Sequence, residues 1–369
     1  MVAALGNSCT VRVNAPSVHS RQQASQRGAL LRTSYGNRSG GCCCGSTPLS
    51  KLSVVGTVRS WRVLSATGRG CRVSVRASMD DVLQDELARP AIMINDISGR
   101  MGFAVGEATV EAGLTLLPVA FTKAGNEQTV ACAGVDVECI NPDDRVAALK
   151  ELHKEHPNLV VVDFTVPSVV NEMASLYCKA GVPFVMGTTG GDREELTCEV
   201  LETNTYAVIA PQMGKQVVAF QAAMIFLADQ FPGCFKGYKM EVVESHQSAK
   251  VDTSGTAKAI VASFQDMGVV GPNGRTFELE DIEKVRVAEE SIGRMGVPEE
   301  HIPGHAYHTY KLTSPDGLVT FQFQHNVCGR SIYANGSVDA ALFLYAKLKE
   351  GSMKRLFNMV DVLGEGSMR

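Results

Sequence analysis

The alternation of short apolar runs with helix-forming segments between residues 91 and 210 constrains the fold more than any other feature. Apolar runs predict buried strands at 91–94, 114–121, 159–162, 182–186 and 206–210. The segments between them predict helices at 103–112, 143–156, 168–180 (with Gly181 as C-cap) and 194–201. Strands that alternate with helices form a parallel sheet with helices on both faces. We therefore predict an α/β fold with a Rossmann-like parallel sheet.

The turn after the first predicted strand has the form of a nucleotide-binding loop. It reads N-D-I-S-G-R-M-G from Asn95 to Gly102, so the order is strand, glycine loop and helix. Gly99 lets the backbone approach a pyrophosphate, and Gly102 allows the helix to pack closely on the strand. Asp96 stands where the first glycine of G-x-x-G-x-x-G belongs. Aspartate tolerates unusual backbone angles better than most residues, but its carboxylate repels a pyrophosphate.

Loops at the carboxyl ends of parallel strands share one rim, where ligands bind. The predicted cofactor-binding residues are Asp96, Ser98, Gly99, Arg100, Met101, Gly102, Thr122, Lys123, Asp163, Phe164, Thr165, Gly187, Thr188, Thr189, Pro211, Gln212 and Met213. The second predicted strand ends without an acidic residue for the ribose hydroxyls, and Lys123 with Arg100 suits a 2′-phosphate instead. This favours NADPH over NADH. Two simpler interpretations stay open: Lys123 as a surface lysine, and strand-end turns that contain Gly, Thr and Asp for conformational reasons.

A second constellation follows a strand-like apolar run at 238–243. A polar loop carries His246 and Lys250, and it closes on Ser254, Gly255 and Thr256 before a helix-forming run. A helix N-terminus binds anions because its first N–H groups are unsatisfied and the helix dipole favours negative charge. A proton donor, a fixed cation and an anion-binding helix start together suit a small carboxylated substrate. The alternative is a capped helix with a solvated histidine and lysine on a loop.

This stretch resembles the signature of a known family. The pattern E-S-H-Q-x-x-K-x-D-T-S-G-T-A-K at 244–258 resembles that of plant-type dihydrodipicolinate reductase, an enzyme of lysine biosynthesis. The bacterial form reads E-x-H-H-x-x-K-x-D-x-P-S-G-T-A. Gln247 replaces its second histidine, and the loop before Ser254 is one residue shorter, as in the plant branch. The family has glycine at the position of Asp96. Further similar segments are D-F-T-x-P at 163–167, G-T-T-G at 187–190, P-Q-M-G-K-Q-V-V-A-F at 211–220, G-H-A-x-H-x-Y at 304–310 and F-Q-H-N-V-C-G-R-S-I-Y-A at 323–334.

The resemblance implies a reaction and roles for the residues. The ring double bond of dihydrodipicolinate is reduced to tetrahydrodipicolinate, with hydride from nicotinamide C4 of NADPH or NADH and a proton from His246. Lys250 anchors one substrate carboxylate, and Ser254, Gly255 and Thr256 bind the other. An unperturbed imidazole titrates near pH 6.5, and a neighbouring anion eases its protonation. Two alternatives stay open: a non-catalytic paralogue that acts as a binding or assembly factor, and an NADPH reductase of another small dicarboxylate.

The C-terminal part predicts a second sheet. Residues 214–230 predict a long bridging helix, and alternating polarity at 307–312 and 318–325 flanks an S-P-D-G turn. With the strand before His246 these runs predict a mixed or antiparallel sheet, and in the family such a sheet mediates subunit association, which implies a homo-oligomer (dimer or tetramer). A helix at 337–349 returns to the nucleotide domain, and 277–300 is polar with no chemistry assigned. The predicted domains are a transit peptide at 1–77, a linker at 78–90, a dinucleotide-binding domain at 91–213 with 335–369, and a substrate-binding and oligomerisation domain at 214–334.

The first 75 or so residues differ in composition from the rest. They are rich in arginine and serine, and the first acidic residue is Asp80. This composition is typical of organelle transit peptides, and a lysine-pathway resemblance favours the plastid stroma. A nucleic-acid-binding arm is the competing interpretation, although the net charge of −4 argues against nucleic acid as the main partner. No apolar run of about 20 residues predicts a membrane span.

Cysteines and histidines do not predict a metal site. Five of the eleven cysteines lie in the leader, where the triplet at 42–44 has the wrong spacing for tetrahedral zinc. The other six form no C-x-x-C pair and predict buried thiols in a reducing compartment. His301, His305 and His308 lie close together in the sequence, but no acid or thiol nearby completes a metal site.

Overall fold

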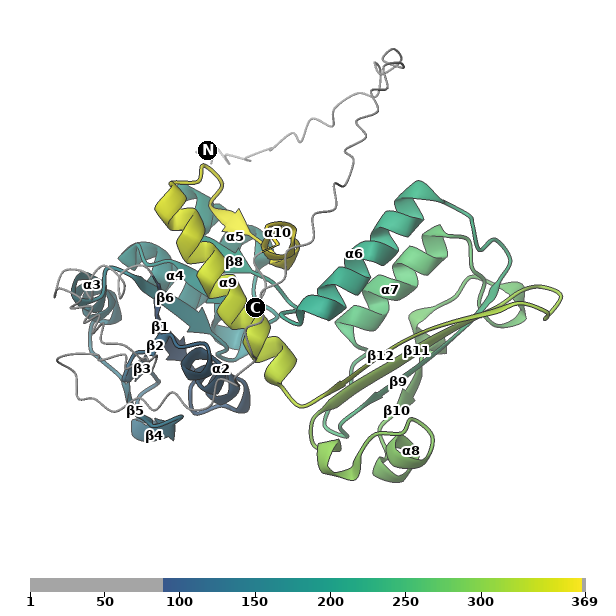
Figure 1. Cartoon of the computed structure of the whole chain (residues 1–369), viewed down its shortest axis with the longest axis horizontal. Helices are drawn as coiled ribbons and strands as arrows, with labels where there is room; N and C mark the ends of the chain where they lie inside the picture. The colour runs from purple at the N-terminus through teal and green to yellow at the C-terminus, as the bar shows by residue number, and fades with distance from the viewer. Residues whose placement is uncertain (1–88, 367–369) are drawn as a thin grey trace, which may run out of the picture. The chain divides into compact units, whose positions relative to one another are not determined.

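A computed structural model describes residues 89–366, so the predicted transit peptide and almost all of the predicted linker lie outside the described residues. The first part of the fold is built on a six-stranded sheet, in the order β13-β8-β7-β6-β1-β2, and all its strands are parallel (Figure 1). Its strands are β1 (Ala91–Asn95), β2 (Thr115–Leu116), β6 (Leu159–Asp163), β7 (Phe184–Met186), β8 (Ala207–Ile209) and β13 (Leu356–Phe357). The predicted α/β class with a Rossmann-like sheet is confirmed.

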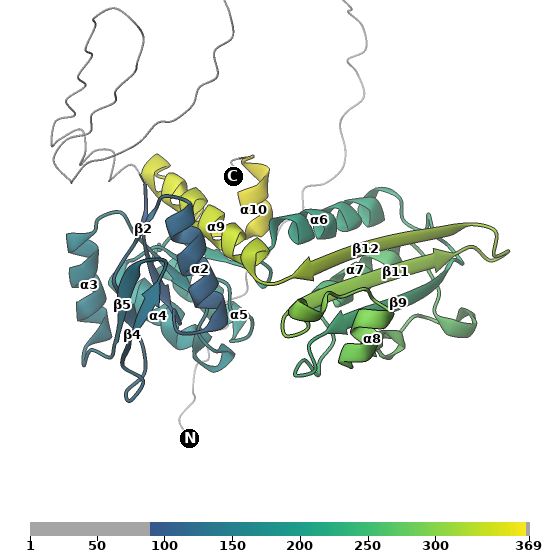
Figure 2. The ribbon, with the colours of Figure 1, turned by 60° about the horizontal axis from the view of Figure 1, so that its bottom comes forward.

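Helices cover both faces of this sheet because successive strand residues point to opposite sides. On β1, Ile92 and Ile94 pack with residues of α2 and α9, whereas Met93 packs with residues of α3, α4 and α5. Figures 1 and 2 show α2 and α9 side by side along one face. The helices are α2 (Arg100–Glu111), α3 (Arg145–Glu155), α4 (Val170–Ala180), α5 (Arg193–Glu202), α9 (Ser331–Glu350) and α10 (Met359–Gly364), with a 3-10 turn η1 (Pro167–Val169) before α4.

The single strand predicted at 114–121 is wrong, because two strands in two different sheets replace it. The Leu117 N–H still donates to Ile92 O (2.8 Å), but Pro118 has no N–H and interrupts the ladder. Beyond Pro118 the chain enters a three-stranded sheet in the order β3-β5-β4. Its strands are β3 (Val119–Phe121), β4 (Gln128–Cys132) and β5 (Val135–Ile140).

The β4–β5 hairpin was not predicted, because its turn lacks the usual signal. Both central turn residues have positive φ, 49° at Ala133 and 84° at Gly134, as the tight turns of two-residue hairpins require. Asn or Asp normally stands before the glycine in such a turn, and alanine there gives no warning.

The second sheet has the order β10-β9-β11-β12, in which β10 is parallel to β9 and the other pairs are antiparallel. The predicted mixed sheet is confirmed. Its core places Met240 of β9 and Tyr310 of β11 against Ile260 and Phe264 of α7, with residues of α6 beside them. Its elements are α6 (Lys215–Gln230), β9 (Lys239–His246), α7 (Gly255–Asp266), β10 (Glu283–Val285), α8 (Ala288–Gly293), β11 (His305–Thr313) and β12 (Thr320–Cys328), with short 3-10 turns at η2 (Pro272–Gly274), η3 (Leu279–Asp281) and η4 (Glu299–His301).

Three boundaries differ from the predictions in ways that matter for function. Strand β9 continues through His246, so this residue lies on a strand and not in the predicted polar loop. Helix α9 begins at Ser331, six residues before the predicted start. The segment at 277–300, to which no chemistry was assigned, contains β10, α8 and Arg286, whose side chain contacts Glu244.

Two exposed thiols contradict the prediction that the six cysteines outside the leader are buried. All six cysteines of the described region are free, but Cys198 and Cys234 are exposed, whereas Cys132, Cys139 and Cys178 are buried as predicted. Both exposed thiols lie at surface-facing positions, Cys198 on α5 and Cys234 in the turn after α6, and no sequence pattern marked that orientation. Among residues 89–366, no helix is long and apolar enough to cross a membrane.

Candidate active site

The carboxyl ends of the parallel strands meet at one rim, as the sequence predicts. Asn95 at the end of β1 pairs with Asp163, Asp163 pairs with Met186, and Met186 pairs with Ile209. The chain leaves β1 for β2 on one side and later returns to β6 on the other side of β1. The edge between β1 and β6 is therefore the point where the strand order reverses, at which open α/β sheets bind their ligands.

A buried hydrogen-bond network joins the strand ends at this point. Asn95 accepts from Phe121 N through Oδ1 (2.9 Å) and donates to Tyr177 Oη through Nδ2 (2.7 Å). Tyr177 in turn donates to Asp163, which also accepts from Thr165 N (2.8 Å) and Thr165 Oγ1 (2.6 Å). Burial raises the pKa of both Asp163 and Tyr177. Asn95 and Tyr177 were not predicted as site residues, since only the sheet register places them together.

The loops after β6 and β7 form one continuous surface. The ring of Phe164 lies directly on Gly187, where any Cβ atom would overlap the ring. Thr188 Oγ1 donates to Thr165 O (2.6 Å), and Thr189 follows as an exposed residue. The structure therefore brings together five of the predicted cofactor-binding residues in one place.

The glycine loop keeps its turn although aspartate replaces its first glycine. Asp96 has φ 68°, in the left-handed region, and Gly99 N donates to Asp96 O (2.9 Å). A Cβ atom on Gly102 would overlap Asp96 O, so α2 packs against the turn as closely as predicted. A Cβ atom on Gly99 would overlap the Asp96 carboxylate, so this carboxylate lies on the loop itself. Burial, and then the charge of Asp163, raise the pKa of Asp96.

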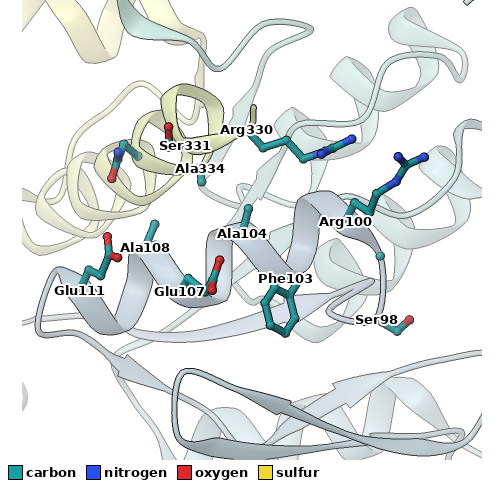
Figure 3. A pocket seen from close by; sticks show the side chains of 12 residues that line it. Ser98, Arg100, Phe103, Ala104, Glu107, Ala108, Glu111, Arg330, Ser331 and Ala334 are labelled. Carbon is teal, nitrogen blue, oxygen red and sulfur yellow. The ribbon is translucent and has the colours of Figure 1, made fainter. Parts of the chain in front are cut away.

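A pocket of about 460 Å³ lies between α2 and the start of α9. Figure 3 shows Arg100 and Arg330 together at one end of it, and Glu107 and Glu111 farther along α2. Burial, and then the charge of Arg100, lower the pKa of Arg330, which is consistent with two neighbouring cations. Ser98 and Gly99 of the glycine loop line the same pocket. Its cationic end therefore adjoins the loop predicted to hold phosphate, and Arg330 is a candidate that the sequence did not indicate.

Thr122 and Lys123 lie beside the same loop, although their strand belongs to the three-stranded sheet. The hydrogen bond from Phe121 N to Asn95 Oδ1 ties the end of β3 to the end of β1. Arg145 Nη2 donates to Thr122 O (2.7 Å), so a second cation lies next to the exposed Lys123. Arg145 was not predicted, because it comes from α3.

The loop after β8 connects the cofactor-binding and substrate-binding candidates. Gln212 accepts from Gly214 N (2.9 Å) and donates to Thr256 Oγ1 (3.3 Å). Met213 is buried, and its carbonyl oxygen lies where a Cβ atom on Gly336 of α9 would be. Pro211 precedes them as an exposed residue.

His246 lies at the end of β9, and it faces a second histidine. Its Nε2 is 3.2 Å from Nε2 of His308 on β11, and both side chains are buried. Burial, followed by the charges of Arg286 and Lys250, lowers the pKa of His246 to about 3. Burial lowers the pKa of His308 to about 2. Both rings are therefore neutral near neutral pH.

The buried carboxylate of Glu244 organises the loop that follows. It forms an ion pair with Arg286 and accepts from Ser254 N through Oε2 (3.0 Å). Arg286 Nε donates to Lys250 O (2.6 Å), so one guanidinium spans the strand and the loop. The side chain of Lys250 reaches Asp252 Oδ1 (2.9 Å) and remains partly exposed. Arg286 comes from the segment to which the sequence assigned no chemistry, and its approach depends on the parallel pairing of β10 with β9.

Helix α7 begins next to these groups. Gly255 is its exposed first residue, with nothing within 4 Å of the point that a Cβ atom would occupy, whereas Thr256 is buried. Its first turn carries no acidic residue, and Ser254 makes no side-chain cap. The N–H groups of Gly255 and Thr256 are therefore placed to receive an anion.

The three histidines that are neighbours in the sequence do not form one cluster. His305 Nε2 is bonded to Ser245 Oγ (2.8 Å), whereas His308 turns toward His246 and Glu244. One ligand atom from each of Glu244, His246 and His308 lies within 4.8 Å of the others, a group that could hold a metal ion. The acid that the sequence spacing did not indicate is Glu244, on the neighbouring strand β9. The absence of a resident metal stays a prediction.

The chain combines a Rossmann-like sheet, which has a glycine loop at its switch point, with a buried histidine, a lysine and an open helix start. These features define a dinucleotide-dependent oxidoreductase of a small anionic substrate. The family described as dihydrodipicolinate reductase matches this chain twice, its N-terminal part at residues 91–213 and its C-terminal part at 216–363. The chain belongs to the dihydrodipicolinate reductase family.

Relatives support this membership. The chain is 52% identical over 280 residues to 4-hydroxy-tetrahydrodipicolinate reductase 1, chloroplastic, of Arabidopsis thaliana, and the match covers 76% of this chain and 79% of that protein. It is 52% identical over 282 residues to reductase 2, chloroplastic, of the same plant, with 76% and 78% covered. A dipicolinate-bound dihydrodipicolinate reductase from Paenisporosarcina sp. TG-14 has a similar fold, with a TM-score of 0.51 and 20% identity over 73% of this chain and 97% of that one.

Proposed function

We propose that this chain, an NAD(P)H-dependent oxidoreductase, reduces the ring double bond of dihydrodipicolinate to give tetrahydrodipicolinate in plastid lysine biosynthesis, with His246 as proton donor. The observation that carries the proposal is the position of His246. It is a buried imidazole at the end of β9, in a site that also holds Lys250 and the open start of α7. The nicotinamide, when bound, supplies the hydride.

The residues of the rim fit a dinucleotide except at one position. Gly99 begins a tight turn into α2, and the linked loops at Phe164 and Thr188 form a surface beside it. Asp96 is the misfit, because its carboxylate lies against Gly99. We assign the loop residues 98–102 to the pyrophosphate. Lys123 and its neighbour Arg145 suit a 2′-phosphate, so we propose a preference for NADPH over NADH.

The substrate is a dianion, and the site offers two separate places for its carboxylates. Lys250 provides a partly exposed ammonium, which the substrate shares with Asp252 or takes from it. The backbone N–H of Ser254 is already bonded to Glu244, so the second carboxylate must use the N–H groups of Gly255 and Thr256. Glu244 thus acts as a positioning residue that holds the helix start in place.

Proton transfer requires His246 to gain a proton that it lacks in the free protein. Positive charges of Arg286 and Lys250 oppose that proton, and substrate carboxylates would counteract them. His308 contacts His246 through the two Nε2 atoms, and one of these neutral rings must donate to the other. We propose that His308 is a positioning residue, which fixes the nitrogen of His246 that carries the hydrogen.

The test compares chemistry with cofactor binding in His246→Gln. The oxidation of NADPH and of NADH is followed by absorbance, with dihydrodipicolinate generated in the cuvette by its synthase. Removal of a general acid predicts a loss of turnover of about 100-fold or more, with the NADPH dissociation constant unchanged. His301→Gln, a histidine of the same part of the chain with no contact to His246, is the matched control. Equal losses of turnover and cofactor affinity would contradict the proposed role.

The same assay separates the two alternatives. A folded wild-type protein that binds NADPH but oxidises it only with a different dicarboxylate would be another reductase on this scaffold. A folded protein that binds neither cofactor would be the non-catalytic paralogue.

We further propose that the chain forms a homo-oligomer, a dimer or tetramer, through the second sheet. Strand β12 is an edge strand of that sheet, and Leu318, Val319 and Phe321 at its start are exposed apolar residues. Sedimentation equilibrium of the wild type and of Phe321→Glu measures this directly. A wild type that is monomeric at micromolar concentration would refute the proposal.

A further inference from the structure

Asp96 occupies a position that glycine normally holds. Its φ of 68° lies in the left-handed region, where residues other than glycine are uncommon. The turn is held by the bond from Gly99 N to Asp96 O and by the close approach of Gly102 to the same carbonyl. The backbone of Asp96 therefore cannot move away without opening the first turn of α2.

The side chain of Asp96 is directed onto the loop. Its carboxylate lies against Gly99, where a Cβ atom would overlap both carboxylate oxygen Oδ2 and Cγ. Gly99 is the N-cap of α2, which has no side-chain cap and no acidic residue in its first turn. A helix start of this kind attracts an anion, and here a carboxylate of the chain itself lies beside it.

The surroundings of Asp96 already favour its neutral form. Asp96 is partly buried, and the charged group that acts on it is Asp163 at the end of β6. Two other titratable groups lie near Asp96. The charge of Asp96 contributes to the raised pKa of the Cys139 thiol on β5, and Arg100 is the exposed first residue of α2. Burial and the repulsion from Asp163 raise the pKa of Asp96. A bound pyrophosphate adds more negative charge on the same side and acts in the same direction.

We propose that Asp96 couples cofactor binding to protonation, so that the cofactor pyrophosphate binds together with a proton on the Asp96 carboxyl group. This inference rests on the proposed function, because it assigns the glycine loop to the cofactor. Because the complex holds this proton more tightly than the free protein, cofactor affinity is highest at low pH. It decreases as the pH rises from the pKa of Asp96 in the free protein to its pKa in the complex, by at most about tenfold per pH unit for one proton.

The experiment measures dissociation constants of NADPH and NADH from about pH 5.5 to about pH 8.5 by nicotinamide fluorescence. The wild type is compared with Asp96→Asn, which keeps the shape and tolerates positive φ, and with Asp96→Gly. Glu155→Gln removes an exposed carboxylate at the end of α3, outside the pocket beside the glycine loop, and serves as the control. NADH is included because the 2′-phosphate of NADPH itself titrates near pH 6. Calorimetry in two buffers with different ionisation enthalpies counts the protons taken up on binding.

The expected result is a pH-dependent affinity for both cofactors and a net proton uptake in the wild type and Glu155→Gln. With NADH both effects disappear in Asp96→Asn and Asp96→Gly, which bind NADH at least about tenfold more tightly than the wild type at the alkaline end. With NADPH only the contribution of the 2′-phosphate remains in these variants. A pH dependence seen with NADPH alone assigns the effect to the 2′-phosphate and overturns the inference. So does wild-type binding of both cofactors that equals that of Asp96→Asn at every pH. If no variant binds either cofactor, including Asp96→Gly, the proposed reductase function itself fails.

Discussion

The proposed protonation of His246 on substrate binding can be tested through the pH dependence of catalysis. With a pKa of about 3, protonating His246 at pH 7 costs about 5 kcal/mol in the free protein. A carboxylate about 4 Å from the ring contributes about 4 kcal/mol at an effective dielectric constant of about 20. Two carboxylates at that distance would offset the whole of this cost, and a single carboxylate would offset most of it.

This arithmetic predicts two different pH profiles at saturating cofactor. At saturating cofactor the ratio kcat/KM reports the enzyme that holds cofactor but no substrate, so it should decrease about tenfold per pH unit from about pH 6 to about pH 8. The value of kcat reports the complex, so it should stay constant over that range until the raised pKa of bound His246 is reached. Initial rates of NADPH oxidation, measured with His246→Gln as the reference for uncatalysed proton transfer, give both profiles.

A kcat/KM that does not change over this range, in a wild type much faster than His246→Gln, would contradict the claim that His246 is neutral before the substrate binds and then donates the proton. It would mean that His246 is already protonated in the free protein, or that another group delivers the proton.

Three further predictions follow from single contacts. Lys250→Ala should raise KM and lower kcat together, because we propose that the ammonium both anchors a carboxylate and stabilises developing charge; a change in KM alone would restrict it to binding. Lys215→Met should lower the free energy of unfolding by about 3–5 kcal/mol in urea, because it removes the ammonium that the buried carboxylate of Asp339 contacts. Because the pKa values of His246 and His308 are lowered in the folded protein, the unfolded chain binds more protons than the folded chain below about pH 6.5. The free energy of unfolding should therefore decrease as the pH falls from about 6.5 toward about 3. Replacing one of this pair, in His308→Asn, should reduce that loss by up to about 1.4 kcal/mol per pH unit, and an unchanged slope would contradict the burial argument.

Sequence patterns predicted the parallel sheet, the glycine loop and the position of the strand-end loops at one rim with few errors. The reason is that a strand's apolar run and the turn that follows it are local features, and the carboxyl ends of parallel strands must meet at one edge. The errors lie where a local signal was missing or was interrupted, as at Pro118, which divides one apolar run between two sheets, and at Ala133, which forms a hairpin turn without the expected residue.

The side chains that contact the candidate site residues could not be predicted from the sequence. His246 was expected in a loop, but β9 continues through it, because its backbone pairs with Ala306 of β11. The same pairing brings His308 to His246, and the parallel pairing of β10 brings Arg286 to Glu244. These contacts join residues about 40 to 60 positions apart, so no spacing within a motif indicates them.

Sequence patterns alone identified the candidate groups: a histidine, a lysine and a helix start in one short stretch, and a glycine loop in which Asp96 replaces a glycine. The charge state of His246 and the backbone conformation of Asp96 depend on the folded structure. Burial and the charge of Arg286 make His246 a neutral imidazole, which under the proposed mechanism gains a proton when the substrate binds. The packing of α2 against the turn holds Asp96 at a positive φ with its carboxylate on Gly99. The identity of a side chain is local information, whereas its charge state depends on the solvent it loses and the charges it meets, and the folded chain alone sets both.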